Sequence, residues 1–206
     1  MIYDTEGSLH QAVQQHCLLS GIGLDGVELF GTKVSQARIF RSAEFRDPVT
    51  KNSLGSWDAT IMLAIKDEGY VMDAWIDYRK VKISKRYTKL FRLYRPKLEK
   101  AKGLGLIRIH RNGDLNLIRS LLKKGIPVIV EVHLNTFYRS SWWDHENTHS
   151  LVVIGYERGA FVVHDPNSAY KGYKKDGGSV RVSAEHLKKS LVCPYYRNSI
   201  NILSKK

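Results

Sequence analysis

The 206-residue sequence contains only two cysteines, Cys17 and Cys193. Two thiols can form at most one disulfide, which excludes a disulfide-stabilised scaffold and favours a reducing compartment. No hydrophobic run approaches the roughly 18 residues that a membrane-spanning helix requires. The first residues also lack the basic start and apolar stretch of a secretory signal. From these absences we predict a cytoplasmic protein without a membrane span.

The sequence is not short of hydrophobic residues, but its charge is unevenly distributed. Hydrophobic residues make up 43% of the chain, enough for one substantial core. The formal net charge is +13. Residues 79–111 hold thirteen of the 33 Lys and Arg residues and a single acid, Glu99, so this stretch carries +12. The rest of the chain is therefore close to neutral.

This basic stretch has a helical pattern. Tyr87, Phe91 and Tyr94 fall at i, i+4 and i+7, which predicts a surface helix whose aromatic stripe packs inward while its cations face solvent. A second interpretation is a docking face for an acidic partner, whether peptide, anionic lipid or nucleic acid. No recognisable nucleic-acid module accompanies the stretch, which argues against nucleic acid.

The chain divides into an N-terminal segment and one larger unit. Four glycines between positions 21 and 31 interrupt any long helix in residues 1–45, which we interpret as an extension or a propeptide-like segment. Residues 46–206 form the predicted catalytic domain.

Two helices are marked by their end signals. Asp58 is predicted to cap a helix over residues 59–68, and Asp114 a helix over residues 115–124. A glycine follows each of them, as is typical of helix C-termini. Further predicted elements are strands at 127–132, 150–156, 160–164, 179–182 and 199–203 and a helix at 184–191. Because the helices come first and the strands later, we predict an α+β fold with a mostly antiparallel sheet.

The most informative segment reads H-S-L-V-V-I-G-Y-E-R-G-A-F-V-V-H-D-P, from His149 onward. Two β-branched runs flank a tight turn, which predicts a hairpin. His149 opens the hairpin and Asp165 follows it, so the two side chains can meet at one edge of the sheet. A carboxylate there can fix the tautomer of an imidazole. These residues supply two members of a catalytic triad.

The position of the missing nucleophile is inferred from a resemblance to a known family. The order of several features over residues 46–190 resembles the bacteriocin-processing type of papain-like cysteine peptidase. These features are a capped helix ending in Gly-Tyr, the run L-I-R-S-L-L-K-K-G-I-P-V-I-V, then H-S-L-V-V-I-G-Y and a downstream D-P. The resemblance implies a papain-like fold. One half would be helical and carry the nucleophile, and a twisted antiparallel half would carry His149 and Asp165, with a substrate cleft between them.

In that family the nucleophile helix begins D-C-G, whereas this chain reads Asp58-Ala59. The resemblance implies that Ala59 occupies the nucleophile position, either as an engineered replacement or in a natural pseudoenzyme. The presence of His149 and Asp165 favours replacement, because an abandoned triad is under no chemical pressure to keep them. Cys17 is a rival nucleophile, but the residues after it are poor helix formers.

The family's oxyanion-stabilising glutamine lies about six residues before its cysteine. That position here is Ser53, and Asn52 could serve only if the loop were shifted by one residue. We therefore treat Asn52 as a candidate oxyanion donor beside the backbone amide of residue 59.

A metal site is the main alternative. Residues 145–149 spell H-E-x-x-H, the helical zinc motif in which His145 and His149 would bind the ion. The residues that follow favour a strand, in which positions 145 and 149 would stand about 13 Å apart. We therefore expect no metal and no cofactor, and keep a zinc metallopeptidase as the weaker alternative.

The predicted function is a cysteine peptidase, inactive in this form, acting on a peptide or protein substrate through residue 59, His149 and Asp165. The same site would support an acyltransferase or a deamidase. A catalytically dead peptide-binding module is the remaining alternative.

Overall fold

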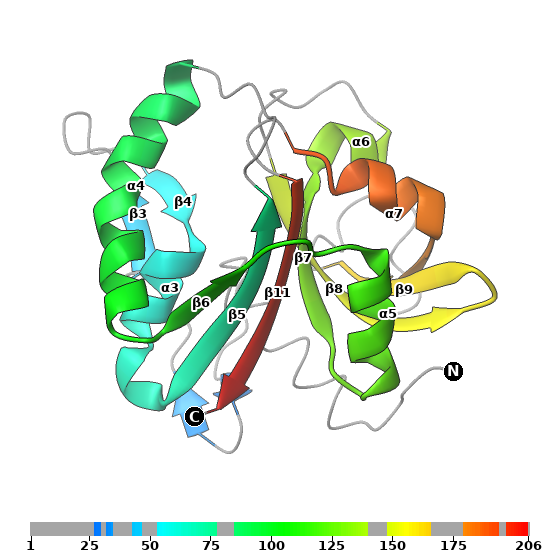
Figure 1. The fold of residues 1–206 in the computed structure, drawn as a ribbon, viewed down its shortest axis with the longest axis horizontal. Coiled ribbons are helices and arrows are strands. Elements are labelled where there is room, and N and C mark those ends of the chain that lie inside the picture. The colour runs from blue at the N-terminus through cyan, green and yellow to red at the C-terminus, as the bar shows by residue number, and fades with distance from the viewer. Residues whose placement is uncertain are drawn as a thin grey trace.

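The computed structural model describes residues 27–29, 32–34, 43–46, 53–77, 85–139, 148–165, 179–193 and 197–205 (Figure 1). Three candidates from the sequence, Cys17, Asn52 and His145, lie outside the described residues. The proposed boundary at residue 45 stays a prediction. Within the described residues, no helix is both long enough and apolar enough to cross a lipid bilayer.

The fold is built on one seven-stranded sheet with the order β10-β9-β8-β7-β11-β5-β6. Neighbouring strands are antiparallel except β5 and β6, which are parallel, so the sheet is mixed. The strands are β5 (Tyr70–Asp77), β6 (Ile107–His110), β7 (Val128–His133), β8 (Thr148–Glu157), β9 (Ala160–His164), β10 (Ser179–Ser183) and β11 (Arg197–Lys205). Two short hairpins lie outside it: β1 (Val27–Leu29) with β2 (Thr32–Val34), and β3 (Glu44–Arg46) with β4 (Ser53–Ser56).

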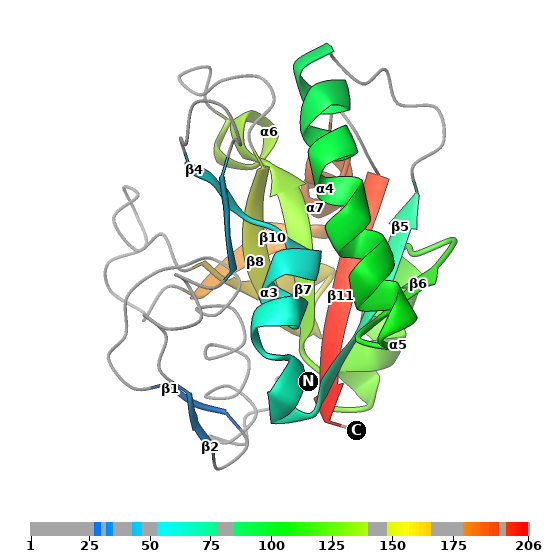
Figure 2. The ribbon, with the colours of Figure 1, turned by 90° about the vertical axis from the view of Figure 1, so that its left-hand side faces the viewer.

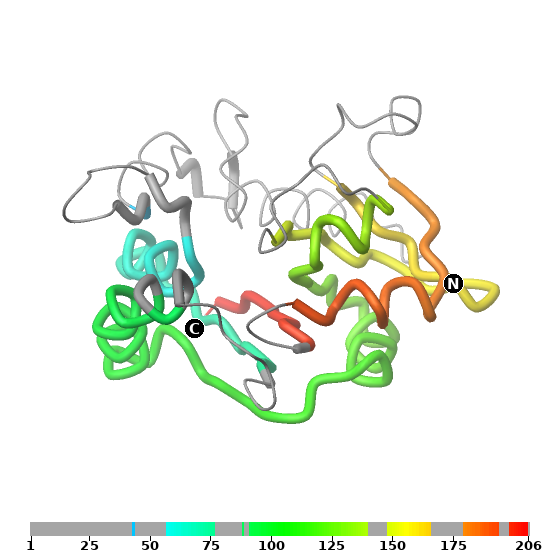
Figure 3. The backbone as a smooth tube through the Cα atoms, turned by 90° about the horizontal axis from the view of Figure 1, so that it is seen from above, coloured from blue at the N-terminus to red at the C-terminus, as the bar shows by residue number. Residues whose placement is uncertain are grey.

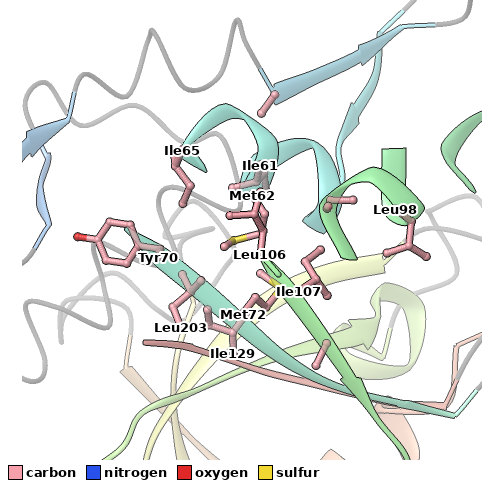
Figure 4. Packing of buried hydrophobic residues seen from close by; sticks show 14 of the residues in the cluster. Ile61, Met62, Ile65, Tyr70, Met72, Leu98, Leu106, Ile107, Ile129 and Leu203 are labelled. Carbon is pink, nitrogen blue, oxygen red and sulfur yellow. The ribbon is translucent and has the colours of Figure 1, made fainter. Parts of the chain in front are cut away.

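Helices lie on both sides of this sheet, as the view from above shows (Figure 3). One group is α3 (Asp58–Ala64) and α4 (Lys85–Gly103), with the 3-10 helix η1 (Lys66–Glu68) after α3. The other group is α5 (Leu115–Lys123), α6 (Leu134–Tyr138) and α7 (Ala184–Ser190). Successive side chains of β7 point to opposite faces of the sheet, so the strand packs against both groups of helices. Ile129 packs in the α3–α4 cluster shown in Figure 4, whereas Val128 and Val130 pack in the α5–α7 cluster.

Several local predictions are confirmed. The Asp114 carboxylate caps α5 by accepting from the N–H groups of Asn116 and Leu117, both at 2.9 Å. The predicted hairpin is β8 and β9, and its turn places Arg158 at φ 48° and Gly159 at φ 80°. Positive φ at both positions suits a two-residue turn whose twist matches that of the strands.

The predicted cap of the first helix was wrong. Trp57 is the N-cap of α3, and Asp58 is already the first helical residue. The Thr60 hydroxyl accepts from the Trp57 N–H at 3.0 Å and donates to the Trp57 carbonyl at 2.7 Å. The actual N-cap therefore lies one residue before the predicted one, because the Thr60 hydroxyl reaches back to Trp57.

The separation of helices from strands was also wrong. β5 and β6 alternate with α3, α4 and α5 in chain order. β5 carries buried side chains on both faces, with Met72 and Asp73 both buried, so its sequence lacks the hydrophobic alternation of a half-exposed strand. The short sequence I-R-I-H of β6 lies within the basic stretch of residues 79–111, whose charge pattern concealed it.

Candidate active site

His149 and Asp165 meet as the sequence predicts. His149 Nε2 lies 2.8 Å from Asp165 Oδ1, and the Asp165 side chain is fully buried. Because a carboxylate only accepts hydrogen bonds, Nε2 carries the proton. The Tyr138 hydroxyl donates to the second oxygen, Asp165 Oδ2, at 2.6 Å. Both carboxylate oxygens therefore have partners, as a buried charge requires.

Three elements position this group. His149 is the second residue of β8 and pairs with Val132 of β7, whereas Asp165 directly follows β9. The register places His164 opposite Val152, so the next residue, Asp165, comes to the same face of the hairpin as His149. Tyr138 ends α6, and its ring centroid lies 5.9 Å from that of His149.

Tyr138 is the member of this hydrogen-bonded group that sequence reasoning missed. It lies 27 residues before Asp165 and belongs to no motif. The sequence offered one signal for Tyr138, its position shortly after the predicted strand 127–132. This position alone does not indicate that Asp165 is its hydrogen-bond partner.

Position 59 has a different set of neighbours. Ala59 is the second residue of α3, is completely buried, and donates its N–H to the Tyr94 hydroxyl at 3.0 Å. The Tyr94 ring also lies against Trp57, with centroids 4.7 Å apart. The inward aromatic stripe of α4 therefore reaches the start of α3. The residue 59 amide, predicted to help hold an oxyanion, is already hydrogen-bonded to Tyr94.

A carboxyl pair links the start of α3 to the sheet. Burial raises the pKa of Asp58 to about 6. Burial, and then the charge of Asp58, raises the pKa of Glu131 well above its ordinary value. Glu131 lies on β7 opposite Ser150, one step along the ladder from the pair formed by Val132 and His149. The residue before Ala59 is thus in electrostatic contact with the strand that supports His149.

The described contacts form two groups on the sheet. Ala59 belongs to the core cluster on the α3–α4 side. His149 pairs with Val132, and Tyr138 and Val132 belong to the cluster on the α5–α7 side. The structure therefore brings His149 together with Asp165 and Tyr138, and Ala59 together with Tyr94. The approach of His149 to position 59 stays a prediction.

The remaining described thiol is not a substitute nucleophile. Cys193 is buried, and its Sγ lies 3.9 Å from the carbonyl oxygen of Glu131. Burial, and then the charge of Glu131, raises the pKa of this thiol far above its ordinary value. A thiol that stays protonated is a poor nucleophile.

The last two residues of the zinc motif lie in a strand, and His145 lies outside the described residues. His149 lies within β8, and the residues from Thr148 to Glu157 are a strand. In this motif the two histidines bind the ion from one face of a helix, whereas His149 lies in a strand. Among the described residues, no group of three or more His, Cys, Asp or Glu side chains could hold a metal ion.

A second histidine–carboxylate contact lies on β5 and β6, and sequence reasoning missed it. His110 Nε2 lies 2.7 Å from Asp73 Oδ1, and Arg108 binds both oxygens of the same carboxylate at 2.8 and 2.5 Å. The pKa of Asp73 is lowered overall. Burial acts to raise this pKa, but the hydrogen bonds and charges of Arg108 and His110 together outweigh burial. The Arg108 guanidinium makes this a surface ion pair, unlike the buried contact at Asp165.

The sequence of this chain matches a known family of peptidases. The model of the Peptidase_C39 like family matches residues 38–189, about three quarters of the chain. The chain belongs to this family. Membership confirms the predicted α+β, papain-like fold class and supports a cysteine-peptidase type of protein.

Two solved structures are similar to this C39-like chain. The peptidase domain of ComA from Streptococcus, a bi-functional ABC transporter involved in quorum sensing, is 15% identical, with a TM-score of 0.46. The match covers 86% of this chain and 82% of that domain. A putative C39-like peptidase from Bacillus anthracis is 14% identical, with a TM-score of 0.45, and the match covers 97% and 90%. No curated protein matches the chain.

Proposed function

We propose that this C39-like chain has a cysteine-peptidase site centred on position 59, and that with Ala59 in place it binds a peptide without cleaving it. The observation that supports this proposal is the buried contact of His149 with Asp165, which Tyr138 completes. Asp165 holds Nε2, so Nδ1 is the ring nitrogen that would exchange a proton with a thiol. Such a fixed imidazole is the base that an acyl-transfer site requires.

A cysteine at position 59 would complete the reaction. His149 would accept the thiol proton, and the thiolate would attack the substrate carbonyl carbon and form a C–S bond. Breaking the C–N bond would release the amine, which takes the proton back from His149. Water, deprotonated by His149, would then attack the thioester carbonyl carbon and break the C–S bond, which releases the acid, and the proton on His149 would return to the sulfur. Ala59 has no sulfur and cannot form the first bond.

The test is the substitution Ala59→Cys, assayed with an alkylating peptide probe and mass spectrometry. The unsubstituted chain is the background control, because it contains Cys17 and Cys193. We expect new labelling at position 59, and we expect it to fall by about a hundredfold or more when His149→Ala is added. Labelling that is indifferent to His149 would show a thiol without an activating base and contradict the proposal.

Peptide hydrolysis is distinguished from transfer and deamidation by the products of the Ala59→Cys variant. Hydrolysis gives two peptide fragments. An added amine acceptor captured in place of water would indicate an acyltransferase. Release of ammonia from a glutamine peptide would indicate a deamidase.

A second candidate function is a peptide-binding protein in which position 59 has no chemical role. It is favoured by the contact between the Ala59 amide and the buried Tyr94 hydroxyl, which takes up a donor that an oxyanion would need. Peptide binding without any His149-dependent labelling of the Ala59→Cys variant would support it.

A further inference from the structure

The strongest feature that the proposed site does not use is the exposed side of α4. Five cations and one acid are described as exposed on this helix: Arg92, Arg95, Lys97, Lys100, Lys102 and Glu99. The Glu99 carboxylate binds Lys102 Nζ at 3.1 Å. We call these six residues the α4 surface, and because five are cations and one is an acid, its formal net charge is positive.

The α4 surface faces away from the core. Tyr94, Leu98 and Ala101 are buried at i, i+4 and i+7 and pack in the cluster that contains α3. Figure 2 shows α4 along almost the full height of the side turned toward the viewer, in front of the sheet. The cations thus occupy the outer side of this 19-residue helix.

A large apolar side chain stands at the end of this surface. Leu104 is 49% exposed, directly after the helix, and its N–H donates to the Lys100 carbonyl at 3.1 Å. Lys97, Lys100 and Leu104 are spaced i, i+3 and i+7, so they continue along one side of the helix. Gly103 and Gly105 flank the leucine and add no side chains around it. At a charged bilayer interface, the exposed leucine would add apolar contact to the attraction that the neighbouring cations supply.

The same contacts disfavour nucleic acid as the partner. Single-stranded nucleic acid is bound by aromatic rings that stack on bases, within a groove of positive charge. The described aromatic rings of α4 instead contact each other and Trp57: Phe91 lies 6.2 Å from Tyr94, and Tyr94 lies 4.7 Å from Trp57. A leucine gains nothing against phosphates.

We propose that the α4 surface docks on an anionic lipid bilayer, with its cations on the phosphate headgroups and Leu104 in the interfacial layer. Each Lys or Arg near such a surface adds attraction, and the apolar side chain adds a contribution that salt does not screen. The whole chain would then bind peripherally, with α4 parallel to the membrane.

The test is co-sedimentation of the full chain with extruded vesicles of phosphatidylcholine alone or with about 30% phosphatidylglycerol. We expect binding only to the anionic vesicles, weakening as salt rises. Lys97→Glu/Lys100→Glu should weaken binding about tenfold or more. Leu104→Ser should weaken it several-fold and leave a residue of binding that salt abolishes. Lys123→Glu/Lys188→Glu, on α5 and α7 across the sheet, makes the same charge change and should have no effect.

Two results would overturn the proposal. One is equal loss of binding for the α4 and control charge reversals, which would indicate only the net charge of the protein. The other is an RNA oligonucleotide that binds more tightly than the vesicles at equal salt, with Leu104→Ser changing neither. Circular dichroism of each variant confirms that it is folded before the comparison.

Discussion

Tyr138 donates its hydroxyl to Asp165 on the carboxylate oxygen that His149 does not contact. The carboxylate is thus held between an imidazole and a phenol, and it cannot rotate without losing one of them. The orientation of His149 depends on this fixed carboxylate.

Tyr138→Phe removes the donor and leaves Asp165 Oδ2 buried with one partner fewer. We expect a loss of about 1–3 kcal/mol in the free energy of unfolding, measured by urea titration. In the Ala59→Cys background, the rate of alkylation should also fall, because the carboxylate no longer fixes the imidazole. Tyr156→Phe, at the far end of β8, is the matched control and should leave the alkylation rate unchanged. Equal rates for both variants would show that Tyr138 has a packing role alone.

The buried Asp58 predicts a pH-dependent stability. Its pKa in the folded protein is raised to about 6, above the ordinary aspartate value of 3.8, so the protonated form is favoured by folding. The stability from this group is complete below about pH 4 and is lost as the pH rises through about 6. Asp58→Asn should therefore stabilise the protein relative to the unsubstituted chain at pH 8, by about 1–3 kcal/mol. The gain should shrink toward pH 4.

Urea unfolding of both proteins at a series of pH values measures this difference. Glu185→Gln is the control, because the salt bridge with Lys189 lowers the pKa of this exposed carboxyl. Its effect should have the opposite sign. A pH-independent difference between Asp58→Asn and the unsubstituted chain would contradict the raised pKa.

The Ala59 amide predicts a stability effect at Tyr94. Tyr94→Phe keeps the ring against Trp57 but leaves the Ala59 N–H without its acceptor. A buried donor without a partner costs about 1–3 kcal/mol. Thermal unfolding should show a lower midpoint, with Tyr156→Phe as the control. No change in the midpoint would indicate that water replaces the hydroxyl.

Gly113 lies just before α5, where the space beside the sheet leaves no room for a side chain. A Cβ at this position would lie 2.7 Å from Trp75 Cβ and 3.2 Å from Ile200 Cδ1. Gly113→Ala should cost about 1–3 kcal/mol of stability, because Trp75 Cβ is attached directly to the backbone of β5 and cannot move aside alone. Gly103→Ala is the matched control, since an added Cβ there meets nothing within 4 Å. Equal unfolding midpoints for the two variants would contradict the predicted clash.

The correct predictions from the sequence concern contacts within one supersecondary unit. His149 and Asp165 are 16 residues apart in a single hairpin, so the turn and the alternation of the strands bring them together. Asp114 and the N–H of Leu117 are three residues apart, and a propensity rule finds them. The errors at Asp58 and at β5 arose where tertiary burial overrides local preference.

The sequence by itself determined the hairpin, the histidine and carboxylate at its open end, the helix capped by Asp114 and the concentration of charge in residues 79–111. Each of these depends on neighbours along the chain. Only the tertiary structure decided that Tyr138 completes Asp165, that Tyr94 takes the Ala59 amide, and that Asp58 lies in electrostatic contact with Glu131. These pairs join elements that meet only when the two faces of the sheet are packed, and no local pattern encodes which side chains then become neighbours.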